Sequence, residues 1–232
     1  LGYVRNSLAR SMVTGRSNTI GFVINSGMGT EFVQRITGGI LQAVDQYDFS
    51  LKLFDAETLN KATVIRRLRE QQITGVLLHH PGIHILKPWL KDLKMLGIPC
   101  GIANMKNETG IGHGVISDDA KGMEDAVRYL FSLGHTKIAH LTANISWNYV
   151  RAREAGYRRG MAGIAACLPR VIRIGPYGRG NNREYLKQLL SEKEKRPTAV
   201  VCAADYHAIE LFQAAYQLNI RVPDELSIIG FG

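Results

Sequence analysis

The 232-residue sequence has little cysteine and no long apolar run, and both shortages narrow what the protein can be. Its three cysteines, Cys100, Cys167 and Cys202, are far apart and odd in number, which excludes a disulfide framework and favours a reducing compartment. No stretch approaches the ~18 apolar residues of a membrane span, and three arginines interrupt the first twenty residues, where a signal peptide needs an apolar core. We therefore expect a cytoplasmic protein with no membrane partner.

The signatures of common enzymes are also missing. There is no G-x-x-x-x-G-K-[ST] phosphate loop, no G-x-S-x-G nucleophile elbow and no cysteine beside a histidine motif. The turn Gly27-Met28-Gly29 resembles a dinucleotide fingerprint, but Phe32 occupies the third glycine position, so a glycine turn with an aromatic ring facing a cleft is the favoured alternative. Catalysis has no positive support, and we expect no enzyme and no cofactor.

One cluster of histidines is a candidate metal site. His79, His80 and His84 could in principle hold zinc. No cysteine, aspartate or glutamate beside them completes a ligand set, so a solvent-touching turn is the favoured interpretation. We expect no metal site.

What is present is a full core and an excess of positive charge. Hydrophobic residues make up 45% of the chain, and 232 residues fit one large α/β unit or, as the better first hypothesis, two domains of roughly 100 residues each. The net charge is +9, of which residues 1–17 carry +3 and residues 151–196 carry +8. The second segment is either a solvated helical face or a surface near an anionic ligand.

Apolar runs alternate with amphipathic stretches along the whole chain, which is the βαβ pattern of parallel sheets covered on both faces. The first series predicts strands at 19–24, 49–54, 75–79 and 98–103, with helices at 32–47, 58–72 and 85–96. The second series predicts strands at 115–116, 138–142, 171–174, 199–203 and 226–231, with helices at 122–133, 150–165, 183–190 and 208–218. The two halves divide near Ser117 and share one plan.

Ligands of open parallel sheets collect beyond the carboxyl ends of the strands, so the turns that follow the strands are the candidate site. Arg153 stands out, because it lies in the first turns of a helix that follows a strand by one loop. Its guanidinium could grip hydroxyls or a carboxylate in bidentate fashion. The alternative is a structural ion pair with Asp118 or Asp205.

Several motifs, in order and spacing along the whole chain, resemble the LacI/GalR family of transcriptional regulators. They include Leu1-Gly-Tyr3, Ala9-Arg-Ser-Met12, Leu133-Gly-His135, Arg153-x-x-Gly-Tyr157 and Val222-Pro223 with its following Ser-Ile-Ile-Gly-Phe. The resemblance implies two Rossmann-like (flavodoxin-like) parallel-sheet lobes of the type I periplasmic-binding-protein architecture. It implies the end of a DNA-binding headpiece and a hinge helix at 1–17, an N-terminal lobe at 18–117 and an incomplete C-terminal lobe at 118–232. The headpiece helices and a closing C-terminal segment are expected to lie outside this sequence.

The resemblance further implies a DNA-binding regulator, in the first instance a repressor, that forms a homodimer or higher homo-oligomer and binds operator DNA and a small effector, a sugar or sugar derivative. In such a family the hinge helix enters the minor groove and wedges an apolar side chain into the central base step, here Met12. The hinge residues implied to contact DNA are Asn6, Ala9, Arg10 and Met12. The effector contacts implied are Phe32, Asn104, Ser117, Trp147, Tyr149, Arg153, Tyr177 and Asp205.

Two positions depart from the family pattern: Ala204 replaces the asparagine usual before Asp205, and Gly232 replaces the aspartate usual after Gly-Phe. The +8 segment suggests testing phosphorylated effectors first. The alternative function is a solute-binding protein of a sugar transporter, which shares the two-lobed core but needs an export signal and no hinge.

Overall fold

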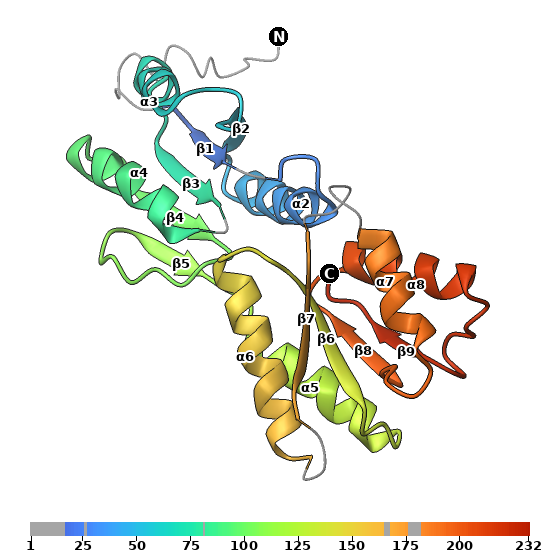
Figure 1. The fold of residues 1–232 in the computed structure, drawn as a ribbon. Helices are drawn as coiled ribbons and strands as arrows, with labels where there is room; N and C mark the ends of the chain where they lie inside the picture. The colour runs from blue at the N-terminus through green and yellow to red at the C-terminus, as the bar shows by residue number, and fades with distance from the viewer. Residues whose placement is uncertain (1–16, 26, 81, 165–167, 176–181) are drawn as a thin grey trace. The chain divides into compact units, whose positions relative to one another are not determined.

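The chain divides between Ser117 and Asp118 into two compact units, each built on its own sheet. A computed structural model describes residues 17–25, 27–80, 82–164, 168–175 and 182–232 (Figure 1). The hinge residues Asn6, Ala9, Arg10 and Met12 and the effector candidate Tyr177 lie outside these ranges. No helix within them is long and apolar enough to cross a bilayer.

The first unit is a five-stranded parallel sheet in the order β2-β1-β3-β4-β5. Its strands are β1 (Thr19–Ile24), β2 (Ser50–Asp55), β3 (Gly75–His79), β4 (Cys100–Ala103) and β5 (His113–Val115). Its helices are α2 (Glu31–Gln46), α3 (Lys61–Glu70) and α4 (Ile83–Met95). Both α2 and α3 begin at polar caps, since the side chains of Thr30 and Asn60 accept backbone N–H bonds.

Alternation along β1 assigns the two faces of this sheet. Phe22 and Ile24 pack with Val33 of α2, whereas Val23 packs into the larger cluster formed by α3 and α4. Side chains two residues apart share a face of a strand, so one buried strand supplies both layers of the core.

The second unit repeats the plan with four parallel strands in the order β7-β6-β8-β9. Its strands are β6 (Ile138–Ala143), β7 (Arg170–Ile174), β8 (Ala199–Cys202) and β9 (Ser227–Ile229). Its helices are α5 (Asp119–Ser132), α6 (Asn148–Ala162), α7 (Asn182–Ser191) and α8 (Asp205–Gln217). Helices α5 and α6 cover one face and α7 and α8 the other, as Figure 1 shows.

The expected fold class, two parallel-sheet α/β lobes, is confirmed. Every predicted element has a counterpart, although some ends differ: β5 spans 113–115 where 115–116 was predicted, and α8 begins at Asp205, three residues before the predicted start. Hydrophobic periodicity detects the apolar face of a helix, and the first turn of α8 carries polar residues that this signal does not register.

Helix α6 lies against α5 through two glycines that no other residue could replace without movement. A Cβ on Gly156 would fall 2.1 Å from the carbonyl oxygen of Ala120, and one on Gly160 would fall 2.7 Å from the Cβ of Val127. The opposite side of α6 carries Tyr157, fully buried, whose hydroxyl donates to the Ile138 carbonyl at 2.9 Å. The glycine of the Arg-x-x-Gly-Tyr motif is therefore a requirement of close helix packing.

We expect Gly156→Ala to destabilise the second unit by roughly 3 kcal/mol, because the contacted atom is backbone and cannot rotate away. Gly163→Ala is the matched control at the end of the same helix, where an added Cβ would meet nothing closer than 3.8 Å. Urea unfolding of both variants measures the difference. Equal midpoints for the two would contradict the packing argument.

Candidate functional site

In each sheet the strand order reverses at one point, and ligands of doubly wound sheets bind at the carboxyl ends of the strands beside it. In the first unit the reversal lies between β1 and β3, and in the second unit between β6 and β8. The residues that follow these four strands are therefore the candidate site of each unit, and each unit is described by itself.

In the first unit Phe32, the aromatic residue predicted to contact an effector, lies in the first turn of α2. Its ring approaches that of His79, at the end of β3, with centroids 5.9 Å apart. His79 is buried, and burial lowers the pKa of its imidazole below the usual value. Its Nδ1 lies 3.4 Å from the carbonyl oxygen of Ala103, so a neutral ring links the ends of β3 and β4.

Two further predicted residues of this unit are brought together. Asn104, directly after β4, has a left-handed backbone (φ 58°), and its side-chain oxygen accepts a hydrogen bond from the Ser117 hydroxyl at 3.0 Å. In the same unit Asn25 directly follows β1, and its buried side-chain Nδ2 has no partner among the described residues. Asn25 was not predicted as a site residue, since an amide after a strand is common in turns.

In the second unit Arg153 is buried and donates three hydrogen bonds to two partners. Its Nε and Nη2 donate to one oxygen of Asp119 at 3.2 and 2.9 Å, and its Nη1 donates to the carbonyl oxygen of Ala203 at the end of β8. Asp119 is also buried, in the first turn of α5. The side chain therefore joins α6, α5 and the end of β8.

The sequence analysis named Asp118 or Asp205 as the partner in the alternative that Arg153 forms a structural ion pair. Both predicted partners were wrong, because the ion pair is with Asp119. Asp118 caps α5 by accepting the backbone N–H of Lys121 at 2.9 Å. Asp205 lies against the backbone near the chain's last residues, because a Cβ on Gly230 would fall 2.1 Å from its Oδ1. Adjacent aspartates at a helix start differ by about 100° in direction, so only Asp119 points inward.

Aromatic rings cover the Arg153 guanidinium. Its central carbon lies 3.9 Å from the ring centroid of Phe231 and 4.9 Å from that of Tyr149, within cation–π range. The Tyr149 ring in turn approaches that of Trp147, with centroids 5.9 Å apart. Burial raises the pKa of the Tyr149 phenol, which keeps it a neutral hydroxyl. Three predicted contacts, Trp147, Tyr149 and Arg153, thus form one continuous group.

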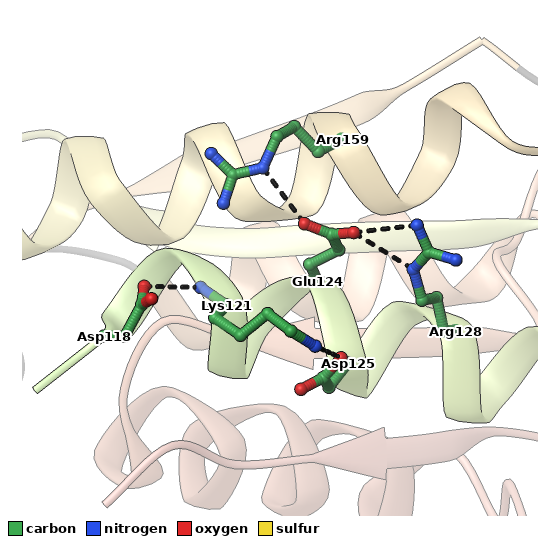
Figure 2. Close-up of polar contacts among 6 residues, drawn as sticks. All are labelled: Asp118, Lys121, Glu124, Asp125, Arg128 and Arg159. Carbon is green, nitrogen blue, oxygen red and sulfur yellow. Dashed lines mark hydrogen bonds and ion pairs between the residues drawn. The ribbon is translucent and has the colours of Figure 1, made fainter.

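Apart from Arg153, several basic residues of the +8 segment form ion pairs on the protein surface. Figure 2 shows Glu124 of α5 between Arg128 of its own helix, at 2.8 Å, and Arg159 of α6, at 3.0 Å. Glu154 similarly pairs with Arg158 and Arg173. Arg158, Arg159 and Arg173, the three of these arginines that belong to the segment, are exposed and make structural pairs, which agrees with the solvated-face interpretation for these positions.

Sequence reasoning missed two buried histidines of the second unit. His140 lies on β6, where its ring stacks on Tyr157 with centroids 5.2 Å apart, and His207 lies in the first turn of α8. Burial lowers the pKa of each imidazole to about 4. A single sequence does not distinguish a buried histidine from an exposed one. The available signals were the position of His140 within an apolar run and that of His207 shortly after a strand.

Within the described ranges no three residues among His, Cys, Asp and Glu gather as a metal-binding group, the 79–84 histidines included. The polar groups at both strand edges are neutral or internally paired, which suits recognition of a small molecule by hydrogen bonds and ring stacking.

Comparisons with known proteins agree with this architecture. A family model described as a periplasmic binding protein-like domain matches residues 127–232. The ribose operon repressor of Escherichia coli K12 is 26% identical over 100% of this chain and 70% of its own length, and the transcriptional repressor PurR of Vibrio parahaemolyticus is 29% identical over 100% and 69%. A LacI-family regulatory protein from Chloroflexus aggregans has the same fold, with a TM-score of 0.77 at 22% identity over 92% of this chain and 78% of that one.

The two parallel-sheet units have the fold of the periplasmic-binding-protein type, and the relatives that match the whole chain are named as transcriptional repressors, not as enzymes. Along its whole length the chain is similar to these repressors, and its fold is that of solved LacI-family regulators.

The buried histidines predict a stability that falls in mild acid. Each imidazole binds a proton near pH 6.5 in the unfolded chain but only near pH 4 in the folded unit. The unfolded state therefore holds more protons between these values, and the free energy of unfolding should drop by up to about 1.4 kcal/mol per pH unit for each histidine as pH falls below about 6.5. Urea unfolding between pH 7 and 5 measures the slope.

The variant His140→Leu should lose its share of this slope, while His140→Leu with His207→Leu should lose both shares. A double variant with the slope of the wild type would show that other groups cause the acid sensitivity.

Proposed function

We propose that this chain is the effector-binding core, with the hinge, of a cytoplasmic DNA-binding repressor. A small molecule bound at the carboxyl edges of the sheets alters the hinge at residues 1–17 and so controls binding to operator DNA. The observation that carries the proposal is the match along the whole chain to proteins named as repressors, combined with polar and aromatic residues gathered beside both points of strand-order reversal.

The same relatives favour this function over a solute-binding protein of a transporter, since a transporter component shares the core but has no use for a hinge. Residues 18–117 would form one lobe and 118–232 the other. Asn6, Ala9, Arg10 and Met12 would contact DNA, with Met12 as the wedge in the minor groove.

The effector that suits this chain is uncharged and rich in hydroxyl groups. The buried charge of Arg153 is already balanced by Asp119, and burial keeps His79 and His207 neutral at physiological pH. Arg158 and Arg159, two exposed arginines of α6, are paired with Glu154 and Glu124, and a third, Arg151, donates to the side-chain oxygen of Asn148. Arg153, Arg158 and Arg159 are therefore each balanced by a carboxylate, which favours a neutral sugar over a sugar phosphate. The rings of Phe32 and Trp147 offer stacking surfaces for such a sugar.

A homodimer is supported by an apolar stripe on α8. Ile209, Phe212 and Tyr216 follow each other at three- and four-residue spacing, which puts them on one side of the helix, and they are 50%, 50% and 76% exposed. A row of large apolar side chains left in water marks an interaction surface. We propose that a second copy of this chain binds this stripe, because in a two-fold symmetric dimer the same surface of both subunits is in contact.

Thermal-shift measurement against neutral sugars, sugar phosphates and purines tests the effector. A neutral sugar at a hundred times its dissociation constant should stabilise the protein by about 2.7 kcal/mol. The double variant Arg153→Leu, Asp119→Leu should lose this response while remaining folded, because removing both partners leaves no unpaired buried charge.

Arg151→Leu, which replaces an exposed arginine of the same helix, is the control and should respond like the wild type. A screen in which only sugar phosphates stabilise the protein would defeat the neutral-effector proposal.

Light scattering during size-exclusion chromatography tests the α8 stripe. Wild-type protein should have the mass of two chains, and Phe212→Glu should have the mass of one, since a charge in the centre of an apolar interface is costly to bury. Tyr129→Glu changes an exposed aromatic of α5 and should leave the mass of the dimer. A dimer that survives Phe212→Glu would place the interface elsewhere.

A further inference from the structure

Buried polar atoms without partners gather in the second unit. Six buried side-chain nitrogen or oxygen atoms of the described residues lack a hydrogen-bond partner, and four of them belong to three residues of this unit. They are Nε2 of His140, Oγ1 of Thr142 and both ring nitrogens of His207. All three side chains are almost completely buried, His207 with 1% exposure.

Two of these residues lie beneath Arg153. His140 and Thr142 are two residues apart on β6 and so share one face, which is the face that α6 covers, because the His140 ring stacks on Tyr157. Arg153 precedes Tyr157 by one helical turn and lies on the same side of α6. Since α6 runs opposite to β6, Thr142 at the strand's carboxyl end comes to the level of the Arg153 turn.

His207 reaches the same place from β8. It begins α8 five residues after Cys202, the last residue of β8, and its ring lies in edge contact with that of Tyr206, with centroids 4.2 Å apart. Strand β8 lies beside β6, with Leu141 opposite Cys202, and Arg153 donates to the carbonyl oxygen of Ala203, so the start of α8 follows from the same edge of the sheet. The three residues therefore converge at the carboxyl ends of β6 and β8, the point where the strand order of this sheet reverses.

Such an arrangement is costly without an outside partner. A buried polar atom left unsatisfied destabilises a protein, and leucine or valine at these positions would avoid the penalty. Thr142 and the neutral His207 ring can each both donate and accept a hydrogen bond, whereas Nε2 of His140 can only accept, because its Nδ1 donates to the Val201 carbonyl at 3.0 Å. A hydroxyl group, which donates and accepts, complements all three; a phosphate dianion or carboxylate, which only accepts, would leave Nε2 of His140 without a donor.

We propose that His140, Thr142 and His207 form a hydroxyl-binding subsite in the second unit, and that His207 determines which effectors the protein accepts. This inference rests on the proposed function, because it names the part of the effector that the second unit recognises. A hydroxyl of a neutral sugar enters beneath Arg153 and bonds to the His207 ring, and effectors that lack this hydroxyl leave the buried atoms unsatisfied.

Calorimetric titration with neutral pentoses and hexoses and their monodeoxy analogues tests the subsite. For the wild type, one deoxy analogue of the best-binding sugar should bind at least tenfold more weakly than its parent. His207→Leu should weaken binding of the parent tenfold or more and remove the difference between parent and analogue. Thr142→Val, which keeps the side-chain volume and is therefore the variant surest to fold, should reduce the difference severalfold.

Gln217→Leu, on the exposed side of the same helix, should bind like the wild type. Unchanged discrimination in both His207→Leu and Thr142→Val would overturn the subsite, leaving these atoms as partners of internal water only, while the proposed function would stand. Failure of every neutral sugar to bind wild-type protein would overturn both the subsite and the neutral-effector proposal.

Discussion

The second unit depends on the burial of one positive charge. A guanidinium removed from water needs an anion and acceptors close by, and Arg153 finds them in Asp119 and in the carbonyl oxygen at the end of β8. This requirement brings the start of α5, the start of α6 and the end of β8 to one point. The ion pair also limits what Arg153 can offer a ligand. Because Asp119 balances its charge, the guanidinium can orient a ligand by hydrogen bonds but adds little net electrostatic attraction.

Helix α6 meets three different surroundings, and its sequence divides accordingly. Gly156 and Gly160 allow the backbone of α5 to come close, Arg153 and Tyr157 face the sheet, and Arg158 and Arg159 remain in water as partners of Glu154 and Glu124. The high positive charge of this segment is thus mostly a property of its outer side. Net charge describes a segment, whereas ligand binding depends on the one face that meets the ligand.

Much of the fold could be predicted from the sequence, because apolar runs of strand length alternate with amphipathic helices and because Pro99 and Pro223 end helices before strands. The partner of Arg153 could not be predicted, since periodicity does not tell which of two adjacent aspartates points inward. His207 and Thr142 were missed for a related reason: polar residues are ordinarily exposed, and their burial follows from tertiary packing that no local pattern records. The roles assigned to the predicted effector contacts stay predictions.

The two units differ in how they use their polar groups. In the first, the Ser117 hydroxyl donates to Asn104 and His79 lies near the Ala103 carbonyl, while Nδ2 of Asn25 is left without a partner among the described residues. In the second, histidine and threonine atoms remain unsatisfied beneath Arg153. An aromatic ring can stack on many different sugar rings. A buried polar atom without a partner, in contrast, favours only ligands that supply the missing hydrogen bond. The second unit, with four unpartnered buried atoms on three residues, therefore offers groups that discriminate between hydroxyl patterns more strictly than stacking does.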